Sequence, residues 1–190
     1  MKGEAHHFSD GRRSPDDLRP DDIQDIKNFS RNNIYLLDNQ GRVFVIGKNE
    51  HGQRGTSKDI PTSEWNQIEY PEPIKQIETL NVPGIFALSE NGNLYYHGYN
   101  EKGYYKITGK NSDITSPVKV LDDVSSLWIF NDSPIIEYKG YVLQILPEEQ
   151  GTLKHIPGAT LPAVLLDNMR ESLVYTKGVL NTLLNHWCHE

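Results

Sequence analysis

The sequence has a single cysteine, Cys188, among its 190 residues. It therefore offers no pair for an internal disulfide, which fits a reducing compartment. Its longest apolar runs, such as residues 163–166, fall far short of the ~20 residues that a membrane-spanning helix needs. No apolar segment follows Met1 and Lys2, so we expect no secretory signal peptide. We expect a cytoplasmic protein without a membrane partner, and export as an effector by another route stays open.

Basic residues are outnumbered, because 19 Lys and Arg face 26 Asp and Glu, which gives a formal net charge of −7. A nucleic-acid surface needs a clustered basic stripe, so this balance disfavours DNA or RNA as a partner. The sequence also lacks His-Glu-x-x-His, Cys-x-x-Cys and Gly-x-Ser-x-Gly motifs. We therefore predict no catalytic residues, no cofactor and no metal site, and we favour a non-enzymatic role.

What the sequence does contain is an internal repeat. Residues 34–55 read IYLLDNQGRVFVIGKNEHGQRG, and residues 85–106, fifty-one positions later, read IFALSENGNLYYHGYNEKGYYK without a gap. Self-similarity at a fixed period of this length predicts a repeat architecture such as a propeller or a solenoid. The polar and glycine positions that recur are Gly41, Gly47, Asn49 and Gly52 in the first copy and Gly92, Gly98, Asn100 and Gly103 in the second.

Each copy predicts a β-hairpin followed by a structured loop. Apolar runs flank the turns that end at Gly41 and Gly92, and Asn-Gly between such runs is typical of a primed hairpin turn. Glycines at fixed offsets indicate positive φ or close backbone approach, and Asn tolerates the left-handed region. We therefore interpret these eight recurring Gly and Asn residues as structural.

The rhythm of proline, spaced apolar residues and hairpin divides the chain. It predicts a flexible arm over residues 1–19 and a repeat domain over residues 20–190, with units at about 20–70, 71–116, 117–155 and 156–190. The last unit has two interpretations. Residues 161–190 form either a hairpin that turns at Gly178 or a helical cap, because Leu165, Met169 and Leu173 also lie at helical spacing. Both alternatives stay open.

The pattern in residues 86–103, with Ala-Leu before the turn and Gly-x-Asn-x-x-Gly after it, resembles the regulator-of-chromosome-condensation repeat. This resemblance covers roughly residues 20–130. It implies an all-β fold of four-stranded blades, here an incomplete β-propeller arc of about four blades, since the family usually builds seven. The chain departs from the family at Ile46 and His97, where the family usually has Trp.

The resemblance implies several functions, and we select among them by the loops. A protein-protein interaction module is favoured. The first alternative is a guanine-nucleotide exchange factor or other regulator of a small GTPase, such as a bacterial effector that acts on a host GTPase. The second alternative is a subunit that completes a propeller by homo-oligomerisation. Tyr and Arg are typical of interface hot spots. For Tyr104 and Tyr105, packing between blades and contact with a partner stay open. The predicted partner-binding residues are Lys48, Glu50, His51, Gln53 and Arg54 in the first loop and Tyr99, Glu101, Lys102, Tyr104 and Tyr105 in the second.

Overall fold

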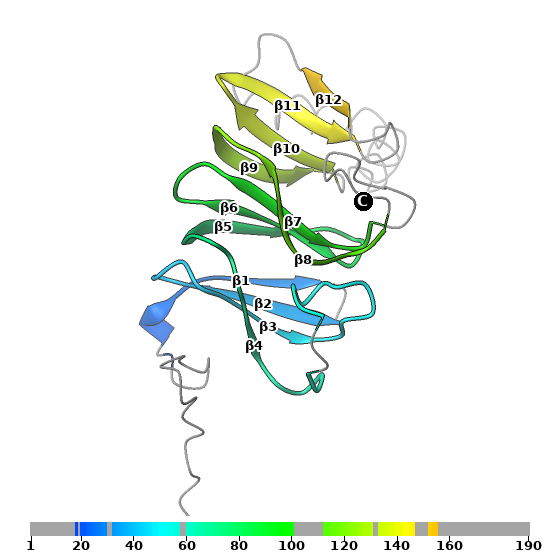
Figure 1. Cartoon of the computed structure of the whole chain (residues 1–190). Coiled ribbons are helices and arrows are strands. Elements are labelled where there is room, and N and C mark those ends of the chain that lie inside the picture. Colours follow the sequence, from blue (N-terminus) through cyan, green and yellow to red (C-terminus); the bar gives the residue numbers. More distant parts are fainter. Residues whose placement is uncertain are drawn as a thin grey trace, which may run out of the picture.

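The described residues form three four-stranded antiparallel sheets, stacked one on the next in the computed structural model (Figure 1). The structure describes residues 18, 20–29, 32–57, 60–100, 112–130, 133–146 and 152–155. None of these residues belongs to a helix long and apolar enough to cross a membrane. The all-β, incomplete propeller that the sequence predicts is confirmed, while residues 1–17 and the predicted fourth unit, 156–190, lie outside the described residues.

Each sheet is an up-and-down meander. The first sheet begins after a short 3-10 helix (Pro20–Asp22) and contains β1 (Ile23–Phe29), β2 (Asn33–Asp38), β3 (Val43–Gly47) and β4 (Asn66–Ile68). The second contains β5 (Ile74–Thr79), β6 (Gly84–Ser89), β7 (Leu94–Gly98) and β8 (Ile114–Leu121). The third contains β9 (Val124–Phe130), β10 (Ser133–Tyr138), β11 (Tyr141–Leu146) and β12 (Thr152–His155).

The hairpin turns follow from single backbone positions. Gly41 and Gly92 take φ of +74° and +81°, and each amide donates to the carbonyl three residues earlier. Their neighbours Gln40 and Asn91 are not among the positive-φ residues, so these turns need one left-handed residue and are not the primed type that Asn-Gly predicts. In the third sheet Lys139 and Gly140 both have positive φ, as a two-residue primed turn requires.

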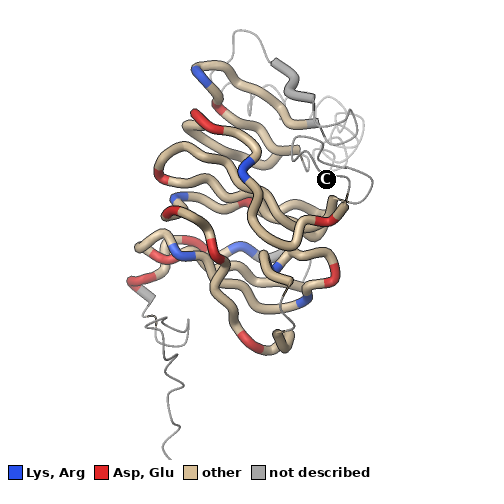
Figure 2. Tube along the Cα trace, in the orientation of Figure 1, with Lys and Arg blue, Asp and Glu red and all other residues tan. Residues whose placement is uncertain are grey.

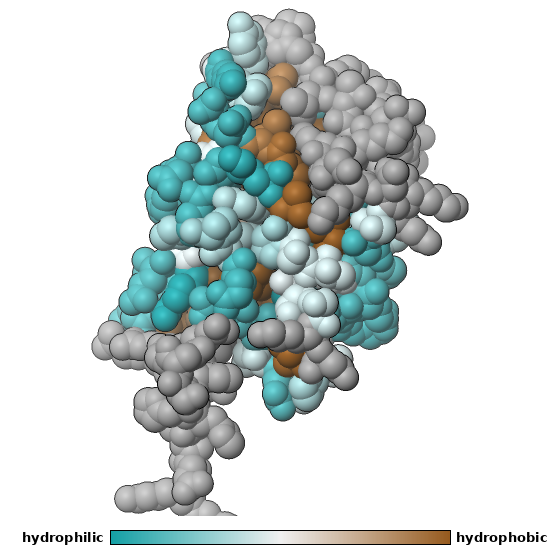
Figure 3. All heavy atoms as spheres, viewed as in Figure 1, coloured by the Kyte–Doolittle hydropathy of each residue, from teal (hydrophilic) through white to brown (hydrophobic). Residues whose placement is uncertain are grey.

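The core lies between the sheets, because strand side chains alternate between two faces and each face packs on the next sheet. Figure 3 shows apolar atoms between the upper sheets and hydrophilic atoms along the side where the hairpin turns lie. One cluster joins the first and second sheets and comprises Tyr35, Leu37, Val43, Val45, Ile68, Ile74, Ile77, Ile85, Ala87 and Tyr95. A second joins the second and third sheets and includes Leu80, Phe86, Leu88, Leu94, Tyr96, Ile114, Val124, Leu127, Ile136, Leu143 and Ile145.

The boundary between the second and third sheets differs from the sequence-based units. The sequence places the start of the third unit at Pro117, but Pro117 to Leu121 belong to β8, the outer strand of the second sheet. Proline removes a backbone donor, and an edge strand tolerates that loss. The third sheet begins at Val124, after Asp123 takes a φ of +55°.

The first strands of the three sheets form a common row, since β1 contacts β5 and β5 contacts β9. The hairpin turns lie at one end of the strands, and the loop after β3 lies at the other (Figure 1). Lys and Arg alternate with Asp and Glu along the described trace and form no stripe of one sign (Figure 2). Those sequence-predicted partner-binding residues that the structure describes lie in the loop after β3 and directly after β7.

Candidate functional site

The loop after β3 is closed by one asparagine side chain. Asn49 Nδ2 donates to the carbonyl of Thr56 (2.7 Å), and Asn49 Oδ1 accepts from the amide of Arg54 (2.9 Å). Gly52, at φ +77°, lies against the backbone of β8, where a Cβ would come 2.6 Å from the carbonyl oxygen of Ile114. These contacts agree with the structural interpretation of Asn49 and Gly52, because they fix a tight excursion that a bulkier residue would block.

The second copy of the motif keeps the asparagine, and the partners of Asn100 include the two residues just before β8. Asn100 is fully buried; its amide donates to Asp113 Oδ1 (2.7 Å), and its Nδ2 donates to the carbonyl of Ser112 (3.2 Å). Gly98 has a φ of +119° and lies against the carbonyl of Pro83. Five predicted residues of this loop, Glu101, Lys102, Gly103, Tyr104 and Tyr105, lie outside the described residues.

Arg54 and Gln53 do not lie on the surface. Their exposed fractions are 1% and 2%, so the interpretation of these two residues as partner contacts is revised. The Arg54 guanidinium donates to the carbonyls of Ile60, Pro61 and Glu64 at 2.8, 2.9 and 2.6 Å, to that of Gly47 at 3.3 Å, and to Asn66 Oδ1 at 2.7 Å. A planar group with five N–H donors can satisfy this many acceptors at once. Arg54 therefore ties Gly47 and the segment 60–66 together from inside.

A buried histidine ties the same loop to the second sheet. His97 is 0% exposed; its Nδ1 lies 3.2 Å from the carbonyl oxygen of Gly52, and its Nε2 lies 3.0 Å from the hydroxyl of Tyr70. A carbonyl only accepts, so Nδ1 carries the proton and Nε2 accepts from the tyrosine. Burial lowers the pKa of His97 to about 4, against an opposing contribution from the Gly52 carbonyl. The ring is therefore neutral at pH 7, and it fills a position where the resembling family usually has Trp.

The exposed part of the site is a cluster of three side chains, His51, Tyr99 and Asp113, which we call the rim cluster. His51 Nδ1 lies 2.8 Å from Asp113 Oδ2, and the two side chains are 34% and 28% exposed. The rings of His51 and Tyr99 meet edge to face, with centroids 5.2 Å apart and planes at 81°. The cluster joins the loop of the first sheet to the loop region of the second. Two of its members, His51 and Tyr99, are predicted site residues.

Beside the rim cluster, Lys48 and Glu50 form an ion pair at 3.3 Å with side chains 50% and 67% exposed. The sequence analysis missed Asp113, because it precedes β8 and has no counterpart in the repeat. Asp113 could have been predicted only from its position directly before the strand that follows the second loop. Among the described residues no group of three or more His, Cys, Asp or Glu side chains could hold a metal ion. The rim cluster and the Lys48–Glu50 pair present charged, aromatic and imidazole groups, the side-chain types that occur in protein-binding surfaces.

No protein-family model matches this chain, and no curated protein matches it in sequence. Solved structures share its fold. Human WBSCR16 superposes with a TM-score of 0.60 at 17% identity over 73% of this chain and 40% of that protein. Yeast RCC1 (Prp20), solved bound to Kap60, superposes with a TM-score of 0.53 at 19% identity over 67% of this chain and 30% of that protein. The chain therefore spans less than half the length of these proteins.

Proposed function

We propose that this chain, whose fold is an RCC1-type repeat propeller arc, is a protein-binding module that recognises its partner through the rim cluster and the adjacent Lys48–Glu50 pair. The observation that carries the proposal is that the loops contain two sets of side chains, one that holds the loop backbone and one that is left partly exposed. The buried Arg54 and His97, together with the partly buried Asn49, hold the loop backbone in place, while His51, Tyr99 and Asp113 remain partly exposed.

Such an arrangement suits binding, because a loop fixed before association loses less conformational entropy when the complex forms. Tyrosine is enriched at interface hot spots, and its large rigid ring contributes contact area at low entropic cost. Asp113 and His51 add a charge-assisted pair that can fix the orientation of a partner. Yeast Prp20, which shares the fold, was solved in complex with the protein Kap60, and this supports a protein as the class of partner.

We propose a small GTPase as the first partner to test, on the strength of the repeat resemblance in residues 86–103. An exchange factor accelerates nucleotide release by stabilising the nucleotide-free GTPase. That mechanism is differential binding between two states and needs no acid–base constellation. The net charge of −7 disfavours docking on nucleic acid as a second role.

The test is affinity capture from a eukaryotic lysate with EDTA present to remove Mg²⁺ and nucleotide, read by mass spectrometry. The intact chain is compared with a rim variant, His51→Ala with Tyr99→Ala. The matched control is Gln40→Ala with Glu90→Ala, two exposed residues of the hairpin turns at the opposite end of the strands. All three proteins are checked for equal melting temperature before use.

The proposal expects at least one protein that the intact chain and the turn control capture and the rim variant loses. If that protein is a GTPase released by GTP with Mg²⁺, purified exchange assays with labelled GDP follow, and accelerated release establishes the exchange function. A captured protein of another class supports the binding module and excludes the GTPase version. Equal capture by all three baits would refute the rim as the binding surface.

A further inference from the structure

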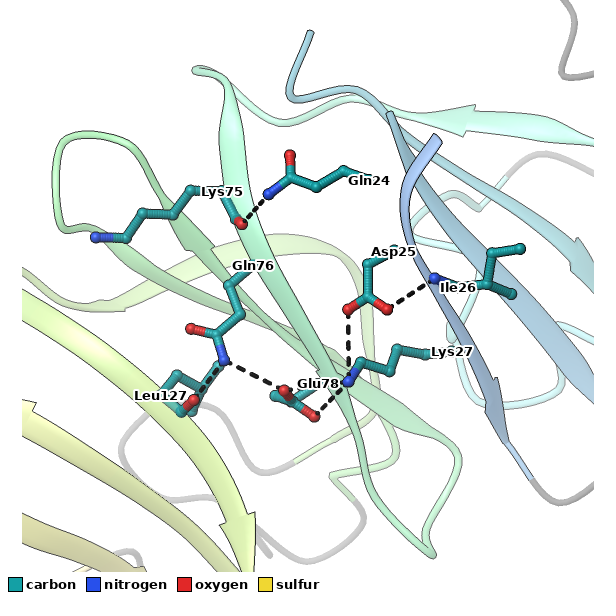
Figure 4. Close-up of polar contacts among 8 residues, drawn as sticks. All are labelled: Gln24, Asp25, Ile26, Lys27, Lys75, Gln76, Glu78 and Leu127. Atoms are coloured by element: carbon teal, nitrogen blue, oxygen red, sulfur yellow. Dashed lines mark hydrogen bonds and ion pairs between the residues drawn. The ribbon is translucent and has the colours of Figure 1, made fainter. Parts of the chain in front are cut away.

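The two edges of the second sheet use their polar groups differently. At the inner edge, the first strands of neighbouring sheets bond to one another, since Gln24 Nε2 donates to the carbonyl of Lys75 at 2.9 Å (Figure 4). Figure 4 also shows Lys27 and Glu78 pointing toward each other, with Nζ 3.3 Å from Oε1. The order of the sheet is β5-β6-β7-β8, so β8 forms the outer edge, and within the described part of the chain no strand pairs with its far side. The inner edge is therefore engaged within the protein, whereas β8 has an unpaired side.

The pairing of β8 with β7 is interrupted near its start. Gly98 pairs with Ile114 and Tyr96 pairs with Val118, so a single residue of β7 stands opposite residues 115–117 of β8. A bulge of this kind disrupts the ladder locally and bends the strand that carries the extra residues. Residues 115–117 are therefore held by fewer backbone hydrogen bonds than the rest of the sheet.

The bulge presents a serine to solvent. Thr115, Ser116 and Lys119 are exposed, and Pro117 is partly buried. Proline has no N–H to pair, and it restricts the residue before it to extended backbone conformations. Ser116 therefore lies in an extended, weakly paired and solvent-facing segment, which is the form in which the groove of a protein kinase takes up an acceptor.

The residues around Ser116 fit one class of protein kinase. Proline-directed kinases phosphorylate Ser or Thr that precedes a proline, and the cyclin-dependent kinases among them favour a basic residue three positions after the acceptor. Residues 116–119 read Ser-Pro-Val-Lys. The other two Ser-Pro steps lack the basic residue, because Ser14 has Asp17 at that position and Ser133 has Ile136.

The third sheet provides an internal comparison. Ser133 begins β10, which lies between β9 and β11, and Pro134 after it is buried. A kinase could engage this segment only if β10 left both of its neighbours. The structure therefore separates two Ser-Pro steps of the described chain into one that is accessible and one that is enclosed.

We propose that Ser116 is a phosphorylation site for a proline-directed protein kinase. In this reaction the Ser116 Oγ attacks the γ-phosphorus of ATP and forms an Oγ–P bond. The bond from that phosphorus to the bridging oxygen breaks, so ADP leaves, and the hydroxyl proton passes to the catalytic aspartate of the kinase. The product is a phosphoserine that carries about −1.5 to −2 charges at neutral pH.

The modified serine lies at the same end of the arc as the rim cluster. A Cβ on Gly52 would come 2.7 Å from the Cα of Thr115, so the bulge contacts the loop that carries His51. Asp113 precedes Ser116 by three residues. Phosphorylation therefore changes the charge that a partner meets at this end. The acceptor site itself is tested without any partner, so it stands or falls independently of the proposed function.

The test is incubation of the full chain with a purified cyclin-dependent kinase, ATP and Mg²⁺, followed by peptide mapping with mass spectrometry. The chain carries Ser14→Ala, so that Ser116 and Ser133 are the Ser-Pro acceptors that remain. We expect one added phosphate, on Ser116. Ser116→Ala should abolish incorporation, and Lys119→Ala should slow it several-fold because the basic side chain is lost. Ser133→Ala is the matched control and should leave the rate unchanged.

A synthetic peptide of residues 112–122 separates sequence from structure. We expect the kinase to phosphorylate the peptide and the full chain at comparable rates. A peptide that is phosphorylated while the full chain is not would overturn the proposal, because the segment would then be inaccessible in the fold. A peptide that is not phosphorylated would overturn it at the level of sequence. Equal phosphorylation of Ser116 and Ser133 in the full chain would also overturn it, because access would then require unfolding.

Discussion

Truncation of Arg54 tests whether the candidate site is held from inside. Arg54→Ala removes a guanidinium that is 1% exposed and makes four hydrogen bonds of 2.9 Å or less. Burial lowers the pKa of Arg54, with Glu64 and Tyr35 acting in the opposite direction, and the group remains charged at pH 7. The loss is therefore that of a charged donor with all its acceptors left behind.

The magnitude follows from those bonds. A hydrogen bond to a charged group contributes about 1.5–3 kcal/mol, so four amount to roughly 6–12 kcal/mol before the cost of burying the guanidinium is subtracted. That cost is several kcal/mol, and water can reach exposed Pro61 and Glu64 after truncation. We expect a net loss of about 3–4 kcal/mol in the free energy of unfolding. Arg54→Lys keeps the charge but not the planar fork, and should lose about half as much.

The assay is urea denaturation followed by tryptophan fluorescence, with hydrogen exchange at residues 47–57 as a local readout. Lys48→Ala is the control, because its side chain is 50% exposed and its pair with Glu50 lies in solvent. The control should fall within about 0.5 kcal/mol of the unmodified chain. An Arg54→Ala protein within about 1 kcal/mol of the unmodified chain would refute the reasoning, because removal of a well-bonded buried group cannot cost so little.

Three further predictions concern pH, backbone and surface charge. The pKa of His97 is lowered from 6.5 to about 4 in the folded state. The stability that the neutral imidazole contributes is therefore complete above pH 6.5 and falls by up to ~3 kcal/mol as the pH drops toward 4. His97→Gln should abolish this part of the pH dependence in denaturation curves. Gly98→Ala should destabilise the protein by ~3 kcal/mol or more, because the new Cβ would collide with the carbonyl of Pro83. At Gly140 a Cβ would meet nothing within 4 Å, so Gly140→Ala should cost only the ~1 kcal/mol of left-handed backbone strain. Thermal melts compare the two variants. The pKa of Lys27 is raised, because its pairing with Glu78 and Asp25 outweighs its partial burial. Its side chain is 29% exposed, and ion pairs in contact with water contribute little to stability. Lys27→Met should therefore change the free energy of unfolding by no more than ~1 kcal/mol, both in 1 M salt and in dilute buffer.

Much of the fold could be predicted from the sequence, because each repeat contains both the alternating apolar residues of its strands and the glycine of the hairpin turn between them. The glycines that recur at positions 41 and 92 mark turns, and the alternating apolar residues between them mark two buried faces. The turn type could not be predicted in this way. Asn91-Gly92 has the residues of a primed turn, yet only the glycine takes positive φ, because the loop between the paired strands is longer than two residues.

The candidate site was predictable only in part. His51 and Tyr99 follow from their place in the repeated loop, and both lie in the rim cluster. Arg54 and Gln53 occupy the same polar stretch, and the guanidinium of Arg54 is held inside by carbonyls from residues 60–64, which a local pattern does not bring together. Asp113 was missed for the same reason, since its partners lie 62 and 13 residues away.

The central claim is that a protein partner binds the loop end of the arc through the rim cluster. Hydrogen–deuterium exchange of the captured complex tests it most directly, since protection reports which backbone segments the partner covers. The account predicts new protection over residues 48–57 and 112–115, with the hairpin turns at 39–41 and 90–92 exchanging as in the free chain. Protection confined to those turns, with unchanged exchange at the rim, would contradict it.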